Sequence, residues 1–156
     1  KLSPEARNLI TIENDEWSHG LEKSLELEKH LALVLDIHHH WIKDEEYMDP
    51  NDDRVKRVID SWRGVRPSMH YSYSRDEHLA VAGLGDSTHT EMHNIKDLLD
   101  RGCKKQKLRA HSDLLPNTKV NDWALSFSDN FDIQVEAKGK NMASEQLYRQ
   151  RESNLI

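Results

Sequence analysis

The sequence predicts an α/β fold on a parallel sheet, with about four β/α units in 156 residues. Short apolar segments alternate with helical patterns, which is typical of βαβ units. Residues 31–37 are apolar at nearly every position, as expected of a strand buried on both faces. A barrel and an open doubly wound sheet both fit this alternation, but no strand is followed by a glycine-rich phosphate loop.

The four strands are expected over residues 8–13, 31–37, 67–72 and 131–137. A helix follows each strand. Ser18 is the expected N-cap of the first helix, with Leu21 and Leu25 on one face. Asp53 is the expected cap of the second, and Gly64 ends it. The remaining predicted segments are an acidic loop over 43–53 and helices over 117–129 and 140–151.

Residues 76–109 are predicted to be a polar insertion within a single domain spanning residues 1–156. One short helix is expected in it, over residues 91–100. Its three histidines are expected to be solvated because the segment is polar; they are His78, His89 and His93.

The composition excludes several classes of protein. Hydrophobic residues make up 36% and charged residues 32%, which indicates a globular chain rather than a disordered one. No apolar stretch reaches the roughly 18 residues of a membrane span, so no membrane contact is expected. The single cysteine, Cys103, excludes an intrachain disulfide and favours a cytoplasmic location, nucleoid-associated in a bacterium. A chain that begins with Lys1 is expected to be a fragment or a processed piece.

The formal net charge of −6 argues against a protein that binds nucleic acid by its overall field alone. Bound dications would reverse the sign of the charge locally, because they are large positive charges in their sites. The charge therefore leaves a metal-dependent nuclease open.

Every predicted strand ends in a residue type that binds metals. Glu13 ends the first strand and His70 the third, and Glu136 ends the fourth. Asp36, His38 and His39 lie at the end of the second strand. The carboxyl ends of parallel strands share one edge, which holds the active site in barrel enzymes. His111 follows in a loop.

Each of these residues also has a purely structural interpretation. Glu13 and Glu136 are also compatible with paired core charges, and Asp36 with a helix cap that fixes His39. His19, His30 and Cys103 are expected to be solvated or incidental. A mixed carboxylate and imidazole set would select Zn, Mn or Fe and permit two or more metals that share a carboxylate.

Five segments resemble the UV-damage endonuclease family: 9–15, 34–40, 67–72, 109–113 and 131–138. The strings D-I-H-H-H at 36–40 and V-E-A-K at 135–138 are the most specific. The resemblance implies the C-terminal half of a TIM barrel, related to endonuclease IV and xylose isomerases. It implies a hydrolase that nicks damaged double-stranded DNA 5′ to UV photoproducts, with up to three divalent metals.

Manganese is the expected metal, with zinc and magnesium as alternatives. The resemblance implies that the catalytic residues are Glu13, Asp36, His70 and Glu136. The implied metal ligands are Glu13, Asp36, His39, His70, His111 and Glu136. Glu13 would be the carboxylate shared between metals.

The sequence departs from the family in two places. Ser68 stands where many members have a lysine beside the metals, and the insertion is longer than expected. Four strands are also half of a barrel. The other half is expected from a longer chain, a partner chain or a second copy.

Two further expectations concern DNA. The basic run Lys104, Lys105, Lys107 and Arg109 is predicted to contact phosphates. The aromatic residues nearest the strand ends are Tyr71, Tyr73 and Trp41, and none of them is a candidate for probing the damaged stack. Two other functions stay open: a sugar isomerase-type enzyme of the same superfamily, and an inactive half-barrel or degenerate homologue.

Overall fold

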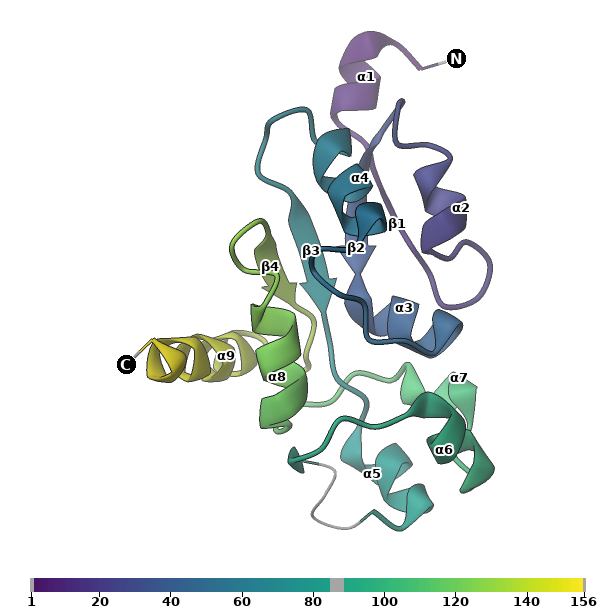
Figure 1. The fold of residues 1–156 in the computed structure, drawn as a ribbon, viewed down its shortest axis with the longest axis vertical. Helices are drawn as coiled ribbons and strands as arrows, with labels where there is room; N and C mark the ends of the chain where they lie inside the picture. Colours follow the sequence, from purple (N-terminus) through teal and green to yellow (C-terminus); the bar gives the residue numbers. More distant parts are fainter. Residues whose placement is uncertain (1, 85–88, 156) are drawn as a thin grey trace.

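A computed structural model of the chain describes residues 2–84 and 89–155. Its strands are β1 (Thr11–Glu13), β2 (Ala32–Asp36), β3 (Ser68–Tyr71) and β4 (Asp132–Val135). They form one sheet in the order β1-β2-β3-β4, and each neighbouring pair is parallel (Figure 1). The predicted parallel α/β sheet is confirmed, with each strand shorter at its ends than predicted.

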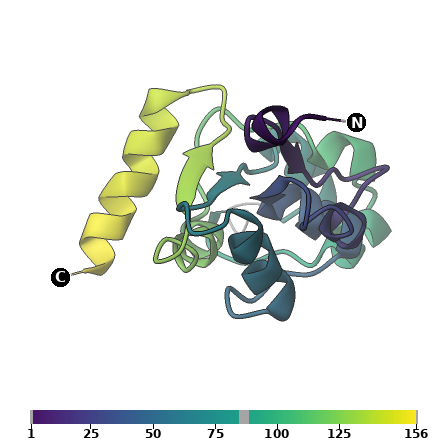
Figure 2. The same cartoon turned by 90° about the horizontal axis from the view of Figure 1, so that it is seen from above.

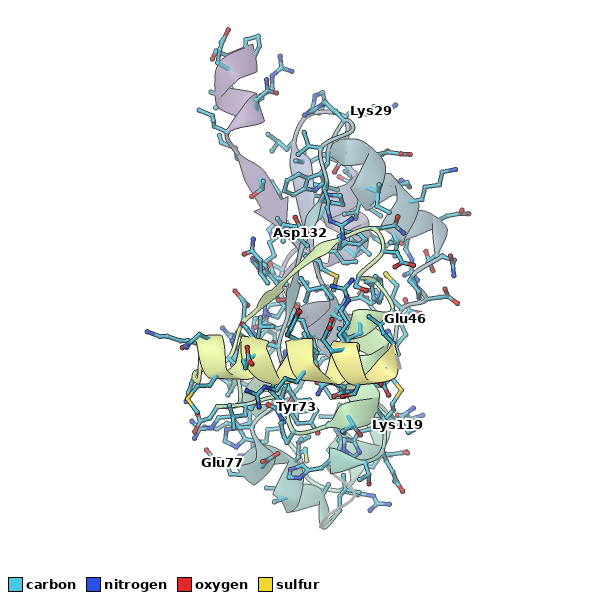
Figure 3. The ribbon with its side chains drawn as sticks, turned by 90° about the vertical axis from the view of Figure 1, so that its left-hand side faces the viewer. Lys29, Glu46, Tyr73, Glu77, Lys119 and Asp132 are labelled. Carbon is cyan, nitrogen blue, oxygen red and sulfur yellow. The ribbon has the colours of Figure 1, made fainter. Side chains whose placement is uncertain are left out.

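Helices cover one face of this sheet. In Figure 2, α2 (Leu21–Leu25), α4 (Asp53–Ser61) and α8 (Thr118–Leu125) lie on the same side. The long α9 (Asn141–Asn154) lies beyond β4. Figure 3 shows α9 crossing between Asp132, at the start of β4, and Tyr73, just beyond β3. The remaining elements are α1 (Pro4–Asn8), α3 (Ile37–Asp44), α5 (Asp76–Leu79), η1 (Ala80–Ala82), α6 (Ile95–Asp100) and α7 (Lys105–Leu108).

The strand register divides the side chains into two faces. Paired residues in parallel strands point to the same side, and alternate residues point to opposite sides. The face toward the helices is apolar and carries Ile12, Leu33, Leu35, Met69, Tyr71, Ile133 and Val135. The opposite face carries smaller and polar residues: Thr11, Glu13, Ala32, Val34, Asp36, Ser68, His70, Asp132 and Gln134. The apolar face therefore makes the core, and the polar face leads to the carboxyl edge.

Several predicted boundaries are wrong for local reasons. His38 and His39 lie in the first turn of α3, a helix that was not predicted, because Asp36 caps it by accepting a hydrogen bond from the His39 amide (2.8 Å). The N-cap of α2 is Gly20 rather than Ser18. The cap of α4 is Asp52 rather than Asp53.

The segment 76–109 contains more helix than predicted and is not polar throughout. It forms α5, η1, α6 and α7, and it contributes Leu79, Ile95, Leu98, Cys103 and Leu108 to the core. α6 corresponds to the short helix predicted over residues 91–100, but it begins only at Ile95. Sequence periodicity missed α5, η1 and α7 because each is only about one turn long. No helix among the described residues is both long and apolar enough to cross a membrane.

Asn14 joins the first two strands at the carboxyl edge. Its side chain is fully buried, donates to the Asp36 carbonyl (2.9 Å) and accepts from the Asp36 amide (2.9 Å). These two bonds continue the strand pairing one step beyond Glu13, the last residue of β1. The position of Asp36 therefore depends on an amide side chain rather than on another strand residue.

Replacing Asn14 with Ala should lower the free energy of unfolding by about 1–3 kcal/mol, because it leaves buried backbone groups of Asp36 without partners. Urea denaturation measures the loss. The matched control is Asn8→Ala, which alters an exposed asparagine at the end of α1 and should change stability little. Equal stability of the two variants would show that Asn14 does not fix the edge.

Candidate metal centre

Four side chains converge at the carboxyl edge of the sheet. Glu13, Asp36, His70 and Glu136 each offer one ligand atom, and these four atoms lie within 4.8 Å of one another. Each residue comes from the end of a different strand, or directly after it. The in-register pairing of Asp36 with His70 and of His70 with Gln134 brings the strand ends level. The structure thus gathers these four predicted site residues at one point.

Two buried atoms in this group lack hydrogen bonds. The second carboxylate oxygen of Asp36, Oδ2, has no hydrogen-bond partner within the part of the chain that the structure describes. His70 Nδ1 lies 3.1 Å from Glu13 Oε1 and 3.5 Å from Glu136 Oε1 but makes no aligned hydrogen bond to any described residue. Buried polar groups are rarely left this way in folded proteins. A divalent cation would satisfy both atoms, so the residues present fit a metal ion.

The electrostatics of the site follow from burial and close charges. Burial raises the pKa of Asp36 to about 7, although the neighbouring His39 opposes this rise. Contact with His70 lowers the pKa of Glu13, and contact with Glu13 raises the pKa of His70. Without a cation, the site therefore retains protons that a metal would displace.

His39 lies beside this group and contacts several acidic side chains. Its Nδ1 lies 3.1 Å from the Asn14 carbonyl oxygen and 3.4 Å from Asp36 Oδ2. Burial alone would lower the pKa of His39, but the nearby carboxylates, led by Asp36, raise it overall. The capping and ligand interpretations of Asp36 and His39 are compatible, since one Asp36 oxygen caps α3 and the other is free to bind a cation.

Glu16 was not identified from the sequence. Its side chain is only 4% exposed, and it places one oxygen 3.5 Å from His39 Nε2 and the other 3.0 Å from Arg109 Nε. It therefore links the site to the basic run. The available signal was its place in the strand-end loop, three residues after Glu13.

His38 is held by hydroxyl groups and serves a structural role. Ser74 Oγ donates to the Leu108 carbonyl (2.6 Å), so it accepts from His38 Nε2 (3.0 Å). His38 Nδ1 then accepts from Ser72 Oγ (2.7 Å). Burial lowers the pKa of His38 well below its usual value, so the ring is neutral and both of its nitrogens are engaged.

His111 and Ser68 border the site without joining the four-atom group. His111 forms an isolated antiparallel bridge with Ser74, and its ring centroid lies 6.2 Å from that of His38. Burial lowers the pKa of His111, which favours a neutral imidazole able to act as a ligand. Ser68 shares the polar face with His70, and its buried hydroxyl has no hydrogen-bond partner among the described residues.

The basic run lies on and beside α7. Lys105 Nζ donates to the Lys43 carbonyl (3.2 Å) and lies 3.7 Å from Glu45, which ties α7 to the end of α3. Lys104, Lys107 and Arg109 are exposed. The contact between Arg109 and Glu16 places this residue next to the strand-end loop.

A parallel β/α sheet with acidic and histidine side chains gathered at its carboxyl edge is the arrangement of a barrel-type enzyme half. The family model described as UV-endonuclease UvdE matches residues 1–155, and the chain belongs to this family. A crystal structure titled SacUVDE matches with a TM-score of 0.63 and 19% identity, covering 99% of this chain and 44% of that one. The fold is accordingly of the TIM-barrel type, as a partial barrel.

Curated relatives agree with the family. A UV-damage endonuclease of Schizosaccharomyces pombe is 28% identical over 97% of this chain, which spans 22% of that protein. A UV DNA damage endonuclease of Bacillus cereus is 22% identical over 94% of this chain and 39% of its own length. A putative UV-damage endonuclease of Acanthamoeba polyphaga mimivirus is 34% identical over 46% of this chain. The chain spans well under half the length of these relatives.

Replacing Glu136 with Gln should lower metal affinity by more than about tenfold, because even outer-shell changes at metal sites cost that much. The fold should persist, since the side-chain volume is kept. Metal content after dialysis, measured by inductively coupled plasma, tests this. Glu145→Gln is the control, because it removes one charge from an exposed side chain of α9. Equal metal content in the two variants would contradict the assignment.

The stability of the metal-free protein and the stabilisation that metal adds should depend on pH in opposite ways. The pKa of Asp36 is raised to about 7 from an unfolded value of about 4, so the folded, metal-free protein holds an extra proton between these pH values. Its stability should fall as pH rises through that window. Metal binding needs the carboxylate, so the increase in Tm on adding Mn²⁺ should be larger at pH 8 than at pH 6. A constant increase would argue against Asp36 as a ligand.

Proposed function

We propose that this chain is the metal-binding part of a DNA repair endonuclease that cleaves a phosphodiester bond 5′ to UV photoproducts. The observation that carries the proposal is the group of four ligand atoms within 4.8 Å, at the strand ends of a chain in the UV-endonuclease family. The names of its relatives favour this reaction over sugar isomerisation.

Glu13, Asp36, His70 and Glu136 would hold a first divalent ion, and His39 and His111 would contribute to a neighbouring one. Three carboxylates with an imidazole favour manganese or zinc over calcium, with magnesium as the other alternative. When bound, such ions polarise a phosphoryl oxygen, lower the pKa of water and stabilise the leaving oxygen.

The protein's own residues would hold and orient the reacting groups. The side chain of Asn14 holds the backbone of Asp36, and the amide of His39 holds one of its carboxylate oxygens. The other carboxylate oxygen, Oδ2, therefore has one position. Arg109, paired with Glu16 at the edge of the site, would contact a backbone phosphate. Lys104 and Lys107 would extend this contact, whereas Lys105 is largely engaged with α3.

The rest of the barrel would close over the polar face and the free edges of β1 and β4. A cavity of about 390 Å³ beside β4 is lined partly by apolar side chains, among them Leu125, Ile133, Val135 and Leu147. At the other end of the sheet, Leu9 is 86% exposed. Unpaired strand edges and apolar surface of this kind call for a covering segment. The proposed partner is the N-terminal half of the barrel, in the same protein or in a partner chain.

A second candidate is a half-barrel that binds metal but does not cleave DNA. Ser68 favours it, because this position in many family members carries a lysine near the metals. The buried Ser68 hydroxyl has no hydrogen-bond partner among the described residues, and a water bound there would supply one.

The isolated chain should not incise irradiated DNA efficiently, because ligands and damage-probing residues from the missing strands are absent. The protein with its N-terminal half, added separately or in one chain, should nick a duplex that carries one cyclobutane dimer in Mn²⁺. An undamaged duplex is the control. Efficient, EDTA-sensitive incision by the isolated chain would contradict this, and no incision by the completed barrel would favour the inactive candidate.

A further inference from the structure

We propose that Trp17 stacks on a base that has left the duplex at the metal edge, and so contributes to the recognition of damaged DNA. The inference rests on the proposed endonuclease function. Trp17 is 50% exposed, whereas the other tryptophans, Trp41, Trp62 and Trp123, are buried or half-buried.

Trp17 lies in a loop that is held by several internal hydrogen bonds. The Asp15 carboxylate accepts hydrogen bonds from the amides of Trp17 (2.6 Å), Ser18 (2.5 Å) and His19 (3.0 Å). The Asp15 amide donates to the His19 carbonyl (2.9 Å), which closes the turn. Four bonds within five residues fix the backbone from which the indole projects.

Lys43 braces the same loop from α3. Its Nζ donates to the Trp17 carbonyl oxygen (2.6 Å). The lysine stem passes over Gly20, where an added Cβ would lie 2.4 Å from Lys43 Cδ. Figure 1 shows the loop between β1 and α2 running beside α3 at the end of the sheet. Trp17 is therefore held on a rigid support, which lowers the entropy lost when it binds a partner.

The loop lies beside the candidate metal centre. Glu16, the residue before Trp17, contacts both His39 and Arg109. Glu13, a member of the four-residue group, is four positions before Trp17 in the chain. The backbone of Trp17 therefore lies next to residues that belong to the site or contact it.

Trp17 is the exposed aromatic residue near this edge, within the described part of the chain. The residues that the sequence placed nearest the strand ends are buried: Trp41 is 5% exposed, Tyr71 is 0% and Tyr73 is 5%. None of these three can reach a base without unpacking the core. The burial of these three residues agrees with the expectation that none of them probes the damaged stack, and Trp17, in the loop after β1, was not considered in that expectation.

The chemistry around Trp17 fits a nucleotide better than the missing half of the barrel. The guanidinium of Arg109 and the ammonium of Lys43 flank the loop, and cations next to an exposed aromatic ring suit the phosphates and bases of an unpaired strand. The missing strands would approach β1 along its side, at Leu9 and Ile10, rather than beyond its carboxyl end. Enzymes that act on damaged DNA unstack the target nucleotide, and an aromatic platform offsets that cost.

The experiment uses the complete protein that carries this chain, in variants Trp17→Ala and Trp17→Phe. The substrate is a duplex with one cyclobutane dimer and 2-aminopurine opposite it, whose fluorescence reports unstacking. Trp17→Ala should raise KM for incision roughly 5- to 100-fold, as expected for one lost stacking contact, and should reduce the fluorescence change. Trp17→Phe should keep most of both. Metal content and Tm should match the wild type.

Val65→Ala is the matched control. Val65 is 65% exposed in the turn before β3, at the opposite edge of the sheet, so its removal should change neither KM nor fluorescence. Wild-type incision with an unchanged KM in Trp17→Ala would reject the stacking role and leave the endonuclease function standing. A loss of metal or Tm in Trp17→Ala would also reject it, in favour of packing against the rest of the barrel. Absence of incision by the wild type would overturn the proposed function itself.

Discussion

Asp36 ends β2, begins α3 and carries a fully buried carboxylate, and both the fold and the site depend on how that carboxylate is held. Asn14 fixes its backbone, and the His39 amide occupies one of its oxygens. The other oxygen is left in a region where burial penalises charge, so the pKa rises to about 7. A buried carboxylate is costly without a compensating charge. The end of β2 is therefore better suited to binding a cation than to forming part of a stable core.

The sheet could be predicted because parallel strands impose strong constraints on sequence. Their apolar segments stand out, and all their carboxyl ends fall on one edge, so the positions of Glu13, His70 and Glu136 followed from strand ends alone. Helix starts were harder to predict. The cap of α2 is Gly20 rather than Ser18, and the Lys43 side chain occupies the space beside Gly20, a contact between distant segments. The short helices of residues 76–109 depend on burial rather than on periodicity.

The residues around the site were less predictable than the four at its centre. His38 and His39 are adjacent in sequence, yet only His39 faces the carboxylates, because the helix turns His38 toward Ser72 and Ser74. The prediction considered residues at the strand ends, so it did not include Glu16, which lies three residues after the end of β1. Its importance comes from Arg109, which lies far away along the chain and meets it only in the folded structure.

Part of the negative charge of the chain lies at the candidate metal centre. Three carboxylates of the four-residue group and that of Glu16 lie at the carboxyl edge, where they would repel a phosphate backbone. Bound dications would cancel this charge and leave Arg109 and Lys43 as the dominant field at the rim. Under the proposed function, metal loading and DNA binding would then be coupled, because the edge would attract a phosphate backbone only after bound ions had offset its negative charge. In this way a chain with a net charge of −6 would be able to bind a polyanion at this edge.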